Sequence, residues 1–390
     1  MPVPLSADAG FTMTNDTTDE SFLRRALDLA REGMGLASPN PCVGAVIVDD
    51  SRQVIGAGTH VYDGLKHAEI LALEQAGNKA RGATLFINLE PCSHQGRTGP
   101  CADAVIAAGI RRVVACMEDP NPAVSGKGFE RLRNAGVSVA SGILQQDARE
   151  LNAAFAKYIR TRTPLVTLKA AMTLDGKIAP PAAGPGSGWI TSELARSHVQ
   201  ELRHQNDAIM VGVGTVLADD PLLTDRSGHP RRRPILRVVL DSRLRLPLDS
   251  QLARTAKDDV LVFCSLAEEK RKQQLQEKGI RVEQIIANGS DGRPALAAVM
   301  RRLGELEITS VLLEGGALIN GAALSSGIVD NVFLYYAPKI LAGTESVSFA
   351  TGEGFRSMND APRVKGIRFH HFEDEFAVEG YLRDPYDSAI

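Results

Sequence analysis

Apolar residues in the first 160 positions of the chain fall alternately into helix-like and strand-like patterns. The segment 21–36 repeats apolar residues every three or four positions, which is typical of an amphipathic helix. Apolar runs over 43–48 and 54–58 flank a polar turn and predict a hairpin. Further strands are expected at 83–89, 112–116 and 137–139, with a closing helix over 147–159. This alternation predicts a layered α/β domain.

A second series of strand and helix patterns begins after the polar, proline-closed segment 161–164. We therefore expect one domain over 19–163 and another over 164–390. The first 18 residues are small and polar and predict a disordered tail. Strands of the second domain are predicted at 165–171, 208–211, 235–240, 260–264, 310–313 and 329–336, with an antiparallel finish at 367–372 and 376–382.

The composition of the 390 residues is that of a soluble globular protein, with 44% hydrophobic and 23% charged residues. A net charge of −3 argues against nucleic-acid binding, and the basic run Arg231-Arg232-Arg233 is interpreted as a solvated loop. No apolar stretch approaches the ~20 residues of a membrane span, and the N-terminal residues do not have the pattern of a secretory signal. Five cysteines are too few and too odd in number for a disulfide framework, which favours the cytoplasm. Cys116 and Cys264 end apolar strands and are expected in the core.

Metal-binding chemistry is concentrated between His67 and Cys101. The chain reads His67-Ala68-Glu69 and later Glu90-Pro91-Cys92, with Cys101 following after eight intervening residues. One imidazole and two thiolates can bind Zn²⁺ and leave a fourth position for water, and helix starts expected near His67 and Cys101 favour the thiolate form. Glu69 is then free to move protons, as in zinc nucleobase deaminases, although their two cysteines are usually two residues apart. The alternatives are a closed structural zinc site with His94 as the fourth ligand, or unrelated buried residues.

The second half offers weaker motifs. Glu314-Gly315-Gly316 follows an apolar strand and opens a helical run, where backbone N–H groups can hold a pyrophosphate. An ordinary glycine-bearing turn explains these residues equally well. Arg203 and Arg226 are candidate phosphate ligands, because guanidinium matches phosphate geometry. Trp189 lies in a glycine-rich segment and either stacks on a flat ligand or caps a core.

With both halves considered, the chain resembles the bifunctional deaminase–reductase family of riboflavin biosynthesis over nearly its whole length after the tail. The motifs that carry the resemblance include the long spacing between the two cysteines, which this family shares. They are the segments 38–44, 67–69, 90–101, 169–177, 187–191, 217–224 and 314–316. The resemblance implies a cytidine-deaminase-like domain followed by a dihydrofolate-reductase-like domain.

The resemblance also implies the two reactions and their cofactors. The first domain would use Zn²⁺ to hydrolyse the 2-amino group of 2,5-diamino-6-(5-phospho-ribosylamino)pyrimidin-4(3H)-one, with Glu69 as the proton carrier and Asn40 and His94 at the pyrimidine edge. The second would use NADPH to reduce the ribosyl group to a ribityl chain. Carried over by motif, the substrate ligands of that domain are Ser187, Arg203, Leu223, Arg226 and Glu314. The NADPH ligands are Ala171, Trp189, Thr215, Asp219, Ser242, Gly316, Ala317, Leu318, Ile319, Asn320, Gly321 and Ala322.

Cofactor choice is less clear from the residues alone. Ser242, Arg243 and Arg245 suit the 2′-phosphate of NADPH, whereas Asp241 suits the free ribose hydroxyl of NADH. The resemblance favours NADPH.

Three other functions compete with this interpretation. A zinc deaminase could carry a non-catalytic C-terminal partner domain, which NADPH oxidation would exclude. A nucleic-acid-editing deaminase predicts a basic, aromatic groove, for which 5% aromatic residues offer little. A structural zinc-binding module leaves Glu69 without a role. We expect a cytoplasmic homo-oligomer that acts on a small molecule and binds neither nucleic acid nor membrane.

Overall fold

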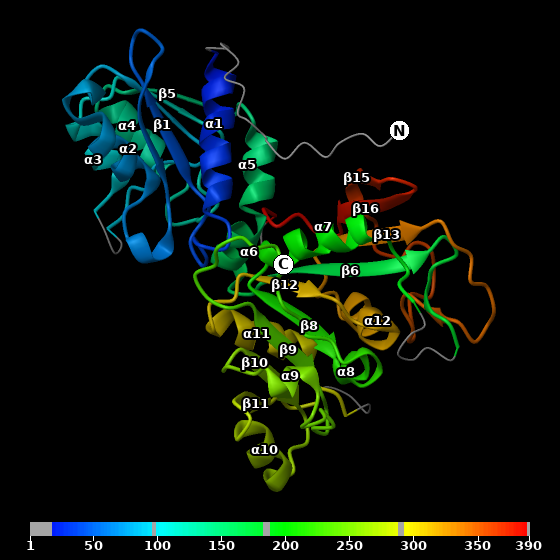
Figure 1. The fold of residues 1–390 in the computed structure, drawn as a ribbon. Coiled ribbons are helices and arrows are strands. Elements are labelled where there is room, and N and C mark those ends of the chain that lie inside the picture. The colour runs from blue at the N-terminus through cyan, green and yellow to red at the C-terminus, as the bar shows by residue number, and fades with distance from the viewer. Residues whose placement is uncertain (1–17, 96–98, 182–187, 288–291, 388–390) are drawn as a thin grey trace.

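A computed structural model describes residues 18–95, 99–181, 188–287 and 292–387. It contains two separate α/β units, each built on its own sheet (Figure 1). The predicted tail lies outside the described residues except for Thr18, whose side chain accepts a hydrogen bond from the Ser21 N–H and caps the first helix. None of the helices in the described ranges is long and apolar enough to cross a membrane.

The first unit is a five-stranded sheet in the order β2-β1-β3-β4-β5. Strand β1 is antiparallel to β2 and β3, and β3, β4 and β5 are parallel. The strands are β1 (Gly44–Val48), β2 (Val54–Thr59), β3 (Thr84–Ile87), β4 (Arg112–Ala115) and β5 (Ser138–Ser141), and the helices are α1 (Asp19–Glu32), α2 (Ala68–Ala76), α3 (Cys101–Ala107) and α4 (Lys127–Asn134). Short 3₁₀ turns, η1 (Tyr62–Gly64) and η2 (Gly77–Ala80), flank α2.

Two glycines let helices pack closely on opposite faces of this sheet. A Cβ at Gly44 would lie 2.1 Å from the Ala26 carbonyl of α1, and a Cβ at Gly58 would lie 2.4 Å from the Ala68 carbonyl of α2. Gly58 pairs with Ala45, the neighbour of Gly44, so α1 and α2 cover different faces. The sheet is thereby enclosed, and β1 is buried along its whole length.

The second unit is a nine-stranded sheet in the order β11-β10-β9-β8-β12-β6-β13-β16-β15. The first seven strands are parallel, and β16 and β15 complete the sheet antiparallel. The strands are β6 (Leu165–Thr173), β8 (Ala208–Gly212), β9 (Leu236–Leu240), β10 (Val260–Cys264), β11 (Ile280–Gln284), β12 (Ser310–Leu313), β13 (Asn331–Ala337), β15 (Lys365–Phe372) and β16 (Glu375–Tyr381). A small second sheet pairs β7 (Lys177–Ala179) with β14 (Val347–Ser348).

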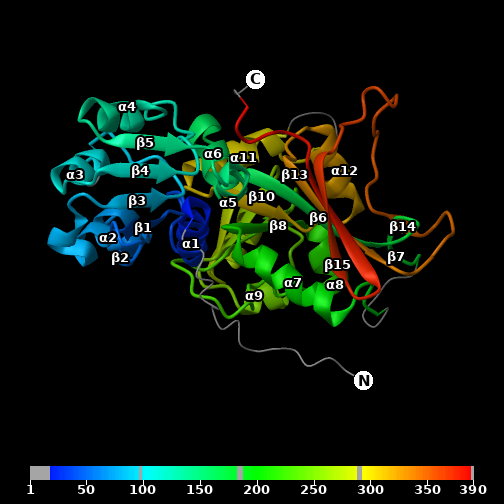
Figure 2. The same cartoon turned by 90° about the horizontal axis from the view of Figure 1, so that it is seen from above.

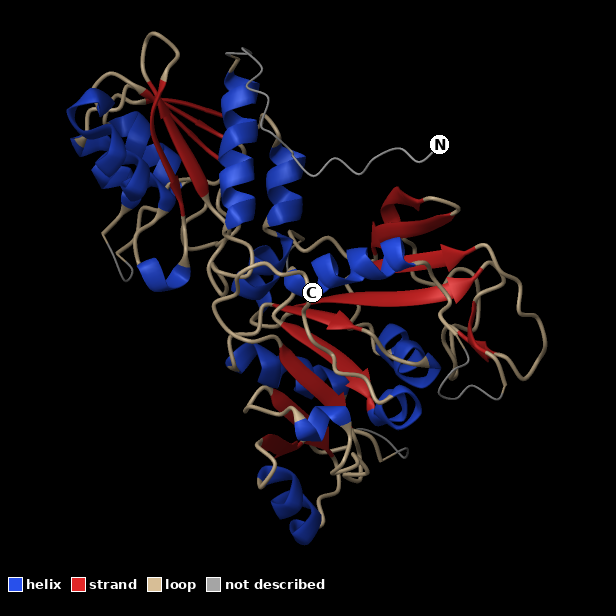
Figure 3. Cartoon of the chain, viewed as in Figure 1, coloured by secondary structure: helices blue, strands red, loops and turns tan. Residues whose placement is uncertain are grey.

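Helices cover both faces of the large sheet, as Figure 3 shows. Alternate residues of β8 belong to different cores, Met210 with α11 and α12 and Val211 with α8 and α9. This double burial explains why the parallel strands are continuous apolar runs. The helices are α7 (Glu193–His204), α8 (Val213–Asp219), α9 (Gln251–Arg254), α10 (Glu269–Gln276), α11 (Leu296–Glu305) and α12 (Ala317–Ser325).

The predicted closing helix over 147–159 is wrong in one respect, because it is two helices, α5 (Gln145–Leu151) and α6 (Ala153–Thr161). The break falls at Asn152, whose side chain accepts from the Cys42 N–H at 2.8 Å and donates to the Cys42 carbonyl at 3.1 Å. Figures 1 and 2 show α5 and α6 between the two sheets. The predicted strands are present within a few residues, and Cys116 and Cys264 are buried as expected.

The interpretation of Arg231-Arg232-Arg233 as a solvated loop is wrong. Arg231 donates to the carbonyls of Arg203, His204 and Asn206 and pairs with Asp225 at 3.0 Å. These contacts bind the basic run to the end of α7, at the junction of the two units. Carbonyl groups at a helix C-terminus attract cations, which is why a basic run can be held here.

Candidate active sites

Glu90 positions the loop that carries Cys92. It follows β3, is buried, and accepts four backbone hydrogen bonds: from Asp119 (3.0 Å), Gly126 (2.9 Å), Gly128 (2.8 Å) and Phe129 (3.1 Å). A carboxylate satisfied by so many N–H groups is a rigid anchor. The sequence interpretation assigned Glu90 no role, because its partners lie 29 to 39 residues further along the chain.

The three expected zinc ligands lie together. The Cys92 Sγ and Cys101 Sγ atoms are 3.7 and 3.2 Å from the His67 Nδ1 atom, and the three ligating atoms lie within 4.8 Å of one another. A tetrahedral zinc ion separates its ligands by on the order of 3.5 Å, so this set fits the ion. Cys101 is the first residue of α3, as expected, whereas His67 precedes the first residue of α2 instead of lying in its first turn.

The Cys92 and Cys101 sulfur atoms lie within 4.8 Å of each other. A hydrogen bond from Cys101 lowers the pKa of Cys92 to about 4 and raises the pKa of Cys101 above its usual range. The Cys101 backbone N–H also donates to the Cys92 sulfur at 3.3 Å. A lowered pKa at Cys92 favours the thiolate form that binds a divalent cation.

Glu69 lies beside this group in α2 with its side chain 3% exposed. Burial raises the pKa of Glu69 to about 7, and its Oε2 atom has no hydrogen-bond partner among the residues that the structure describes. A buried oxygen left unpaired is costly unless it faces a bound group. Glu69 thus has the environment of a proton carrier that faces a metal-bound water.

His94 is exposed and does not join His67, Cys92 and Cys101 among the described groups that could hold a metal. The alternative of a closed site with His94 as fourth ligand is therefore not formed. Asn40 does lie close to the zinc group: its Nδ2 atom is 3.0 Å from the His60 Nε2 atom, and the His60 ring is 5.1 Å from the His67 ring. The sequence interpretation missed His60, a single histidine outside any motif it used.

Three charged side chains form the centre of the second unit. Arg203 in α7 binds Glu314 through two hydrogen bonds of 2.7 and 3.0 Å, and the Lys169 Nζ atom lies 3.9 Å from the same carboxylate. Burial disfavours a charge on Glu314, but the Arg203 and Lys169 charges outweigh it and hold its pKa below the usual range. Burial also lowers the pKa of Lys169. Lys169 belongs to a quoted motif, yet no role was predicted for it, because its partners come from distant elements.

The motif residues for NADPH gather at the carboxyl ends of the parallel strands. Gly316 lies between β12 and α12, Thr215 lies in the first turn of α8 after β8, and Ser242 follows β9. A Cβ at Gly315 would lie 1.9 Å from the Ile319 side chain, so only glycine fits this turn. Ligands of open α/β sheets bind at this edge.

The remaining predicted ligand residues of this unit differ in their exposure to solvent. In α12, which begins at Ala317, Leu318 is exposed and Ile319 packs toward the core, whereas Asn320 and Gly321 contact the segment 349–351. Arg226 is near enough to contribute to the low pKa of Glu314. Leu223 is buried. Asp219 is the last residue of α8, Ala171 lies in β6 and Ala322 lies in α12. Ser187 lies outside the described residues.

Trp189 does not cap a core, because its side chain is 74% exposed with the Arg196 guanidinium 4.8 Å from the ring. The residue-level argument for NADH is also wrong. Asp241 is fully buried and accepts a hydrogen bond from the Leu246 N–H at 2.8 Å, so it does not face a ribose.

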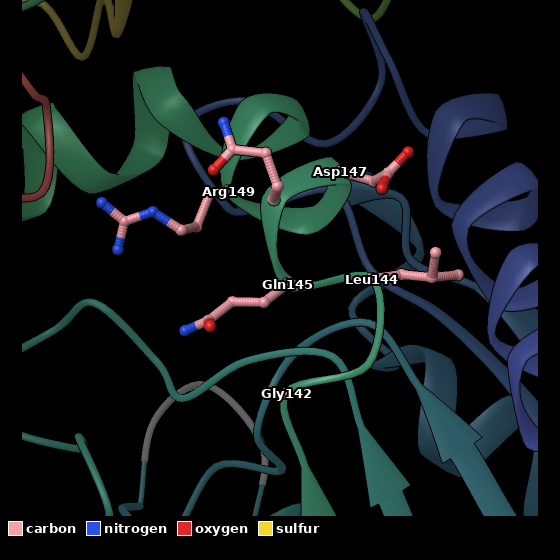
Figure 4. A pocket seen from close by; sticks show the side chains of 6 residues that line it. Gly142, Leu144, Gln145, Asp147 and Arg149 are labelled. Carbon is pink, nitrogen blue, oxygen red and sulfur yellow. The ribbon is translucent and has the colours of Figure 1, made fainter. Parts of the chain in front are cut away.

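An open hollow elsewhere on the first unit lies at the start of α5 (Figure 4). Its lining is mostly polar, and the labelled side chains point in different directions rather than toward one point. It is lined by Gly142, Leu144, Gln145, Gln146, Asp147 and Arg149. It contains none of the clustered groups described above and is not a candidate active site.

A partly buried His–Cys–Cys group beside a buried carboxylate, followed by a parallel sheet with a charged cluster at its carboxyl edge, defines a zinc-dependent deaminase joined to a reductase. The family described as cytidine and deoxycytidylate deaminase zinc-binding region matches residues 16–117, and the RibD C-terminal domain family matches residues 164–377.

Relatives that match nearly the whole chain carry the same two domains in one protein. The chain is 43% identical to riboflavin biosynthesis protein RibD of Actinobacillus pleuropneumoniae, covering 94% of both chains, and 40% identical to RibD of Escherichia coli K12, covering 90% of this chain and 96% of the relative. The solved structure of Acinetobacter baumannii RibD superposes with a TM-score of 0.80 at 36% identity, over 93% of this chain and 98% of that one. The Thermotoga maritima deaminase/reductase gives 0.78 at 37% identity with the same coverage. The chain belongs to the RibD family.

Family membership confirms several sequence predictions. The fold is a cytidine-deaminase-like domain followed by a reductase domain of the dihydrofolate-reductase type, and the protein is a bifunctional enzyme of riboflavin biosynthesis that uses zinc and NADPH. A non-catalytic partner domain is not favoured.

Proposed function

We propose that the two sites act in sequence on one phosphoribosylated aminopyrimidine. Residues 19–163 hydrolyse the 2-amino group of 2,5-diamino-6-(5-phospho-ribosylamino)pyrimidin-4(3H)-one, and residues 164–390 reduce the deaminated product to its ribityl form. The observation that carries the first step is the buried, unpaired Glu69 oxygen beside the His67–Cys92–Cys101 group. The names of the solved relatives supply the substrates.

In the deaminase site, His67, Cys92 and Cys101 hold the zinc ion. Zinc lowers the pKa of a bound water toward neutrality and so makes hydroxide available. Glu69 would accept one proton from the attacking water and pass it to the ring nitrogen. It would then pass the second proton, from the new hydroxyl group on C2, to the amino nitrogen as the C2–N bond breaks and ammonia leaves. The Asn40 amide and His94 contact the pyrimidine edge and fix its orientation.

In the reductase site, NADPH supplies the hydride for the sugar carbon. The backbone of residues Gly316–Ala322, at the start of α12, would hold its pyrophosphate. The other residues that would hold NADPH are those assigned by motif: Ala171, Trp189, Thr215, Asp219 and Ser242. Arg203, Arg226, Glu314, Leu223 and Ser187 hold the substrate. Lys169 joins this set as a cationic donor, because it lies beside Glu314 in the buried charge cluster.

We further propose that the enzyme is a cytoplasmic homo-oligomer. All five cysteines are free, as a reducing compartment requires. The edge strand β15 exposes Ile367 and Phe369 on one face, which suits contact with a second copy.

Incubation of the purified protein with the diaminopyrimidine phosphate tests this function. Without NADPH we expect ammonia release alone; with NADPH, we expect one NADPH oxidised per ammonia released. NADPH oxidation in the absence of ammonia release, or ammonia release without any later oxidation, would contradict the sequence of steps.

A further inference from the structure

The loop that carries Asn40 is held in place by the other domain. Residues 33–43 connect α1 to the buried strand β1, and Ser38 lies in this loop. The Ser38 hydroxyl donates a hydrogen bond of 2.7 Å to the Asp207 carboxylate. Asp207 directly precedes β8 of the reductase domain. A carboxylate of one domain thus binds a loop that reaches the active site of the other.

The Asp207 carboxylate is a buried hydrogen-bond acceptor that its neighbours hold in one position. Its side chain is buried, and the oxygen that accepts from Ser38 also accepts from the Thr309 N–H and the Thr309 hydroxyl, both at 2.8 Å. The Arg233 guanidinium lies 3.6 Å away. Hydrogen bonds to an ionised acceptor are about twice as strong as neutral ones. Because Thr309 precedes β12, this acceptor is tied to two central strands of the sheet.

A second set of contacts holds the same loop. The Arg232 N–H donates to the Gly35 carbonyl at 2.9 Å, and the Arg232 guanidinium lies 4.2 Å from the Tyr62 ring centroid. Gly35 has a φ of +73°, and a Cβ there would lie 2.8 Å from the His204 ring at the end of α7. The loop therefore rests directly on the reductase domain, and the basic run mistaken for a solvated loop is part of its support.

Ser38 is two residues from Asn40, whose orientation depends on His60. The His60 Nδ1 atom lies 2.9 Å from the Lys66 carbonyl, which can only accept. His60 therefore donates from Nδ1, and its neutral ring accepts at Nε2 from the Asn40 NH₂ group at 3.0 Å. This hydrogen bond fixes the orientation of the Asn40 amide, with its NH₂ group toward His60. A shift of the loop at Ser38 would move that amide relative to the zinc ligands.

We propose that Asp207, in the reductase domain, is a positioning residue for deamination and acts through Ser38 on Asn40. The inference rests on the proposed role of Asn40 at the pyrimidine edge. It predicts that deamination depends on the second domain although the two reactions share no chemistry.

The test is Ser38→Ala in the full-length zinc enzyme. The variant keeps Asp207 paired with Thr309, so the reductase domain should be undisturbed. We expect kcat/KM for ammonia release to fall roughly tenfold, which is less than the about 10²-fold that a 1 Å misplacement can cost, with most of the loss in KM. NADPH oxidation with supplied deaminated substrate should remain at the wild-type rate. Ser38→Thr, which retains a hydroxyl, should restore deamination.

Arg149→Ala is the matched control, because it removes a different contact between the two domains. Arg149 joins α5 to the C-terminal segment through Asp384 at 2.9 Å and lies 3.9 Å above the Tyr386 ring, away from the loop. We expect its deamination kinetics to be unchanged. An equal loss in Arg149→Ala, or wild-type deamination in Ser38→Ala, would overturn the proposal.

Asn40→Ala separates this inference from the proposed function. If Asn40→Ala deaminates at the wild-type rate, the assigned role of Asn40 fails and the inference fails with it. If Asn40→Ala is slow while Ser38→Ala is normal, only the inference fails. The proposal requires that Ser38→Ala adds little further loss in the Asn40→Ala background, since both changes act through one amide. Additive losses would overturn it.

Discussion

The two active sites differ in how the chain assembles them. The deaminase site takes its zinc ligands and Glu69 from one stretch, His67 to Cys101, at the starts of two helices. The reductase cluster combines Lys169 from β6, Arg203 from α7 and Glu314 after β12, which meet only because the sheet places β12 beside β6. A local site can be identified from residue spacing. A distributed site depends on strand order, which spacing does not report.

The two sites also differ in what holds their geometry. Backbone N–H groups fix Glu90, and two helix starts fix the ligands, so the deaminase site is preorganised by main chain. The reductase cluster is preorganised by buried charges that satisfy one another. Removal of one charge from such a cluster leaves the other charged groups buried without a counter-charge. Point changes should therefore stop chemistry in the first site and weaken the fold in the second.

Sequence patterns predicted the strands that are buried apolar runs, such as β1, β10 and β12, but did not predict β7, β11 and β14, most of whose residues are only partly buried. They failed where a side chain acts on distant backbone. Asn152 breaks a periodic helix through its bonds to Cys42, and Arg231 becomes half-buried by binding carbonyls at the end of α7. His60 and Asp207 could not be singled out for the same reason, since each depends on partners that only the folded chain supplies.

Among the variants considered, Glu69→Gln should produce the largest difference between the two activities. The amide cannot accept and return a proton, so ammonia release should fall by at least ~10²-fold. Zinc content and NADPH oxidation with the deaminated substrate should be unchanged, because Glu69 is neither a predicted ligand nor near the second site. Parallel ammonia and NADPH assays check both statements. Loss of both activities would show that the sites are not independent.

Cys101→Ser tests the metal set itself. A neutral hydroxyl replaces a ligand that zinc binds as a thiolate, so we expect most of the zinc to be lost on purification and deamination to fall with it. Metal analysis per chain gives the result. Cys264→Ser is the control, because Cys264 is a buried core thiol of the other domain and should leave the zinc content at the wild-type value. Full zinc in Cys101→Ser would exclude the proposed site.

Glu314→Gln should reveal the different nature of the reductase cluster. It leaves the buried Arg203 and Lys169 without their counter-charge, and breaking a buried pair costs about 3–5 kcal/mol. The thermal unfolding of the reductase domain should shift downward even without substrate, whereas zinc content stays constant. Asp384→Asn breaks a more exposed ion pair to Arg149 and should change stability by no more than ~1 kcal/mol. Equal stability of both variants would remove the distinction between the sites.

Arg245→Ala should have the smallest effect. Arg245 follows β9 and its side chain is 60% exposed, where it can meet the 2′-phosphate of NADPH. An exposed ion pair contributes up to ~1 kcal/mol, so we expect kcat/KM for NADPH to fall by about fivefold and that for NADH to stay the same. Asp241→Asn supplies the converse test. Because the Asp241 carboxylate is buried against the Leu246 N–H rather than open to a ribose, its replacement should not reduce NADH use. A selective loss of NADH activity in Asp241→Asn would mean that this carboxylate binds the ribose after all, and that the strand end after β9 is organised by the ligand rather than by the fold.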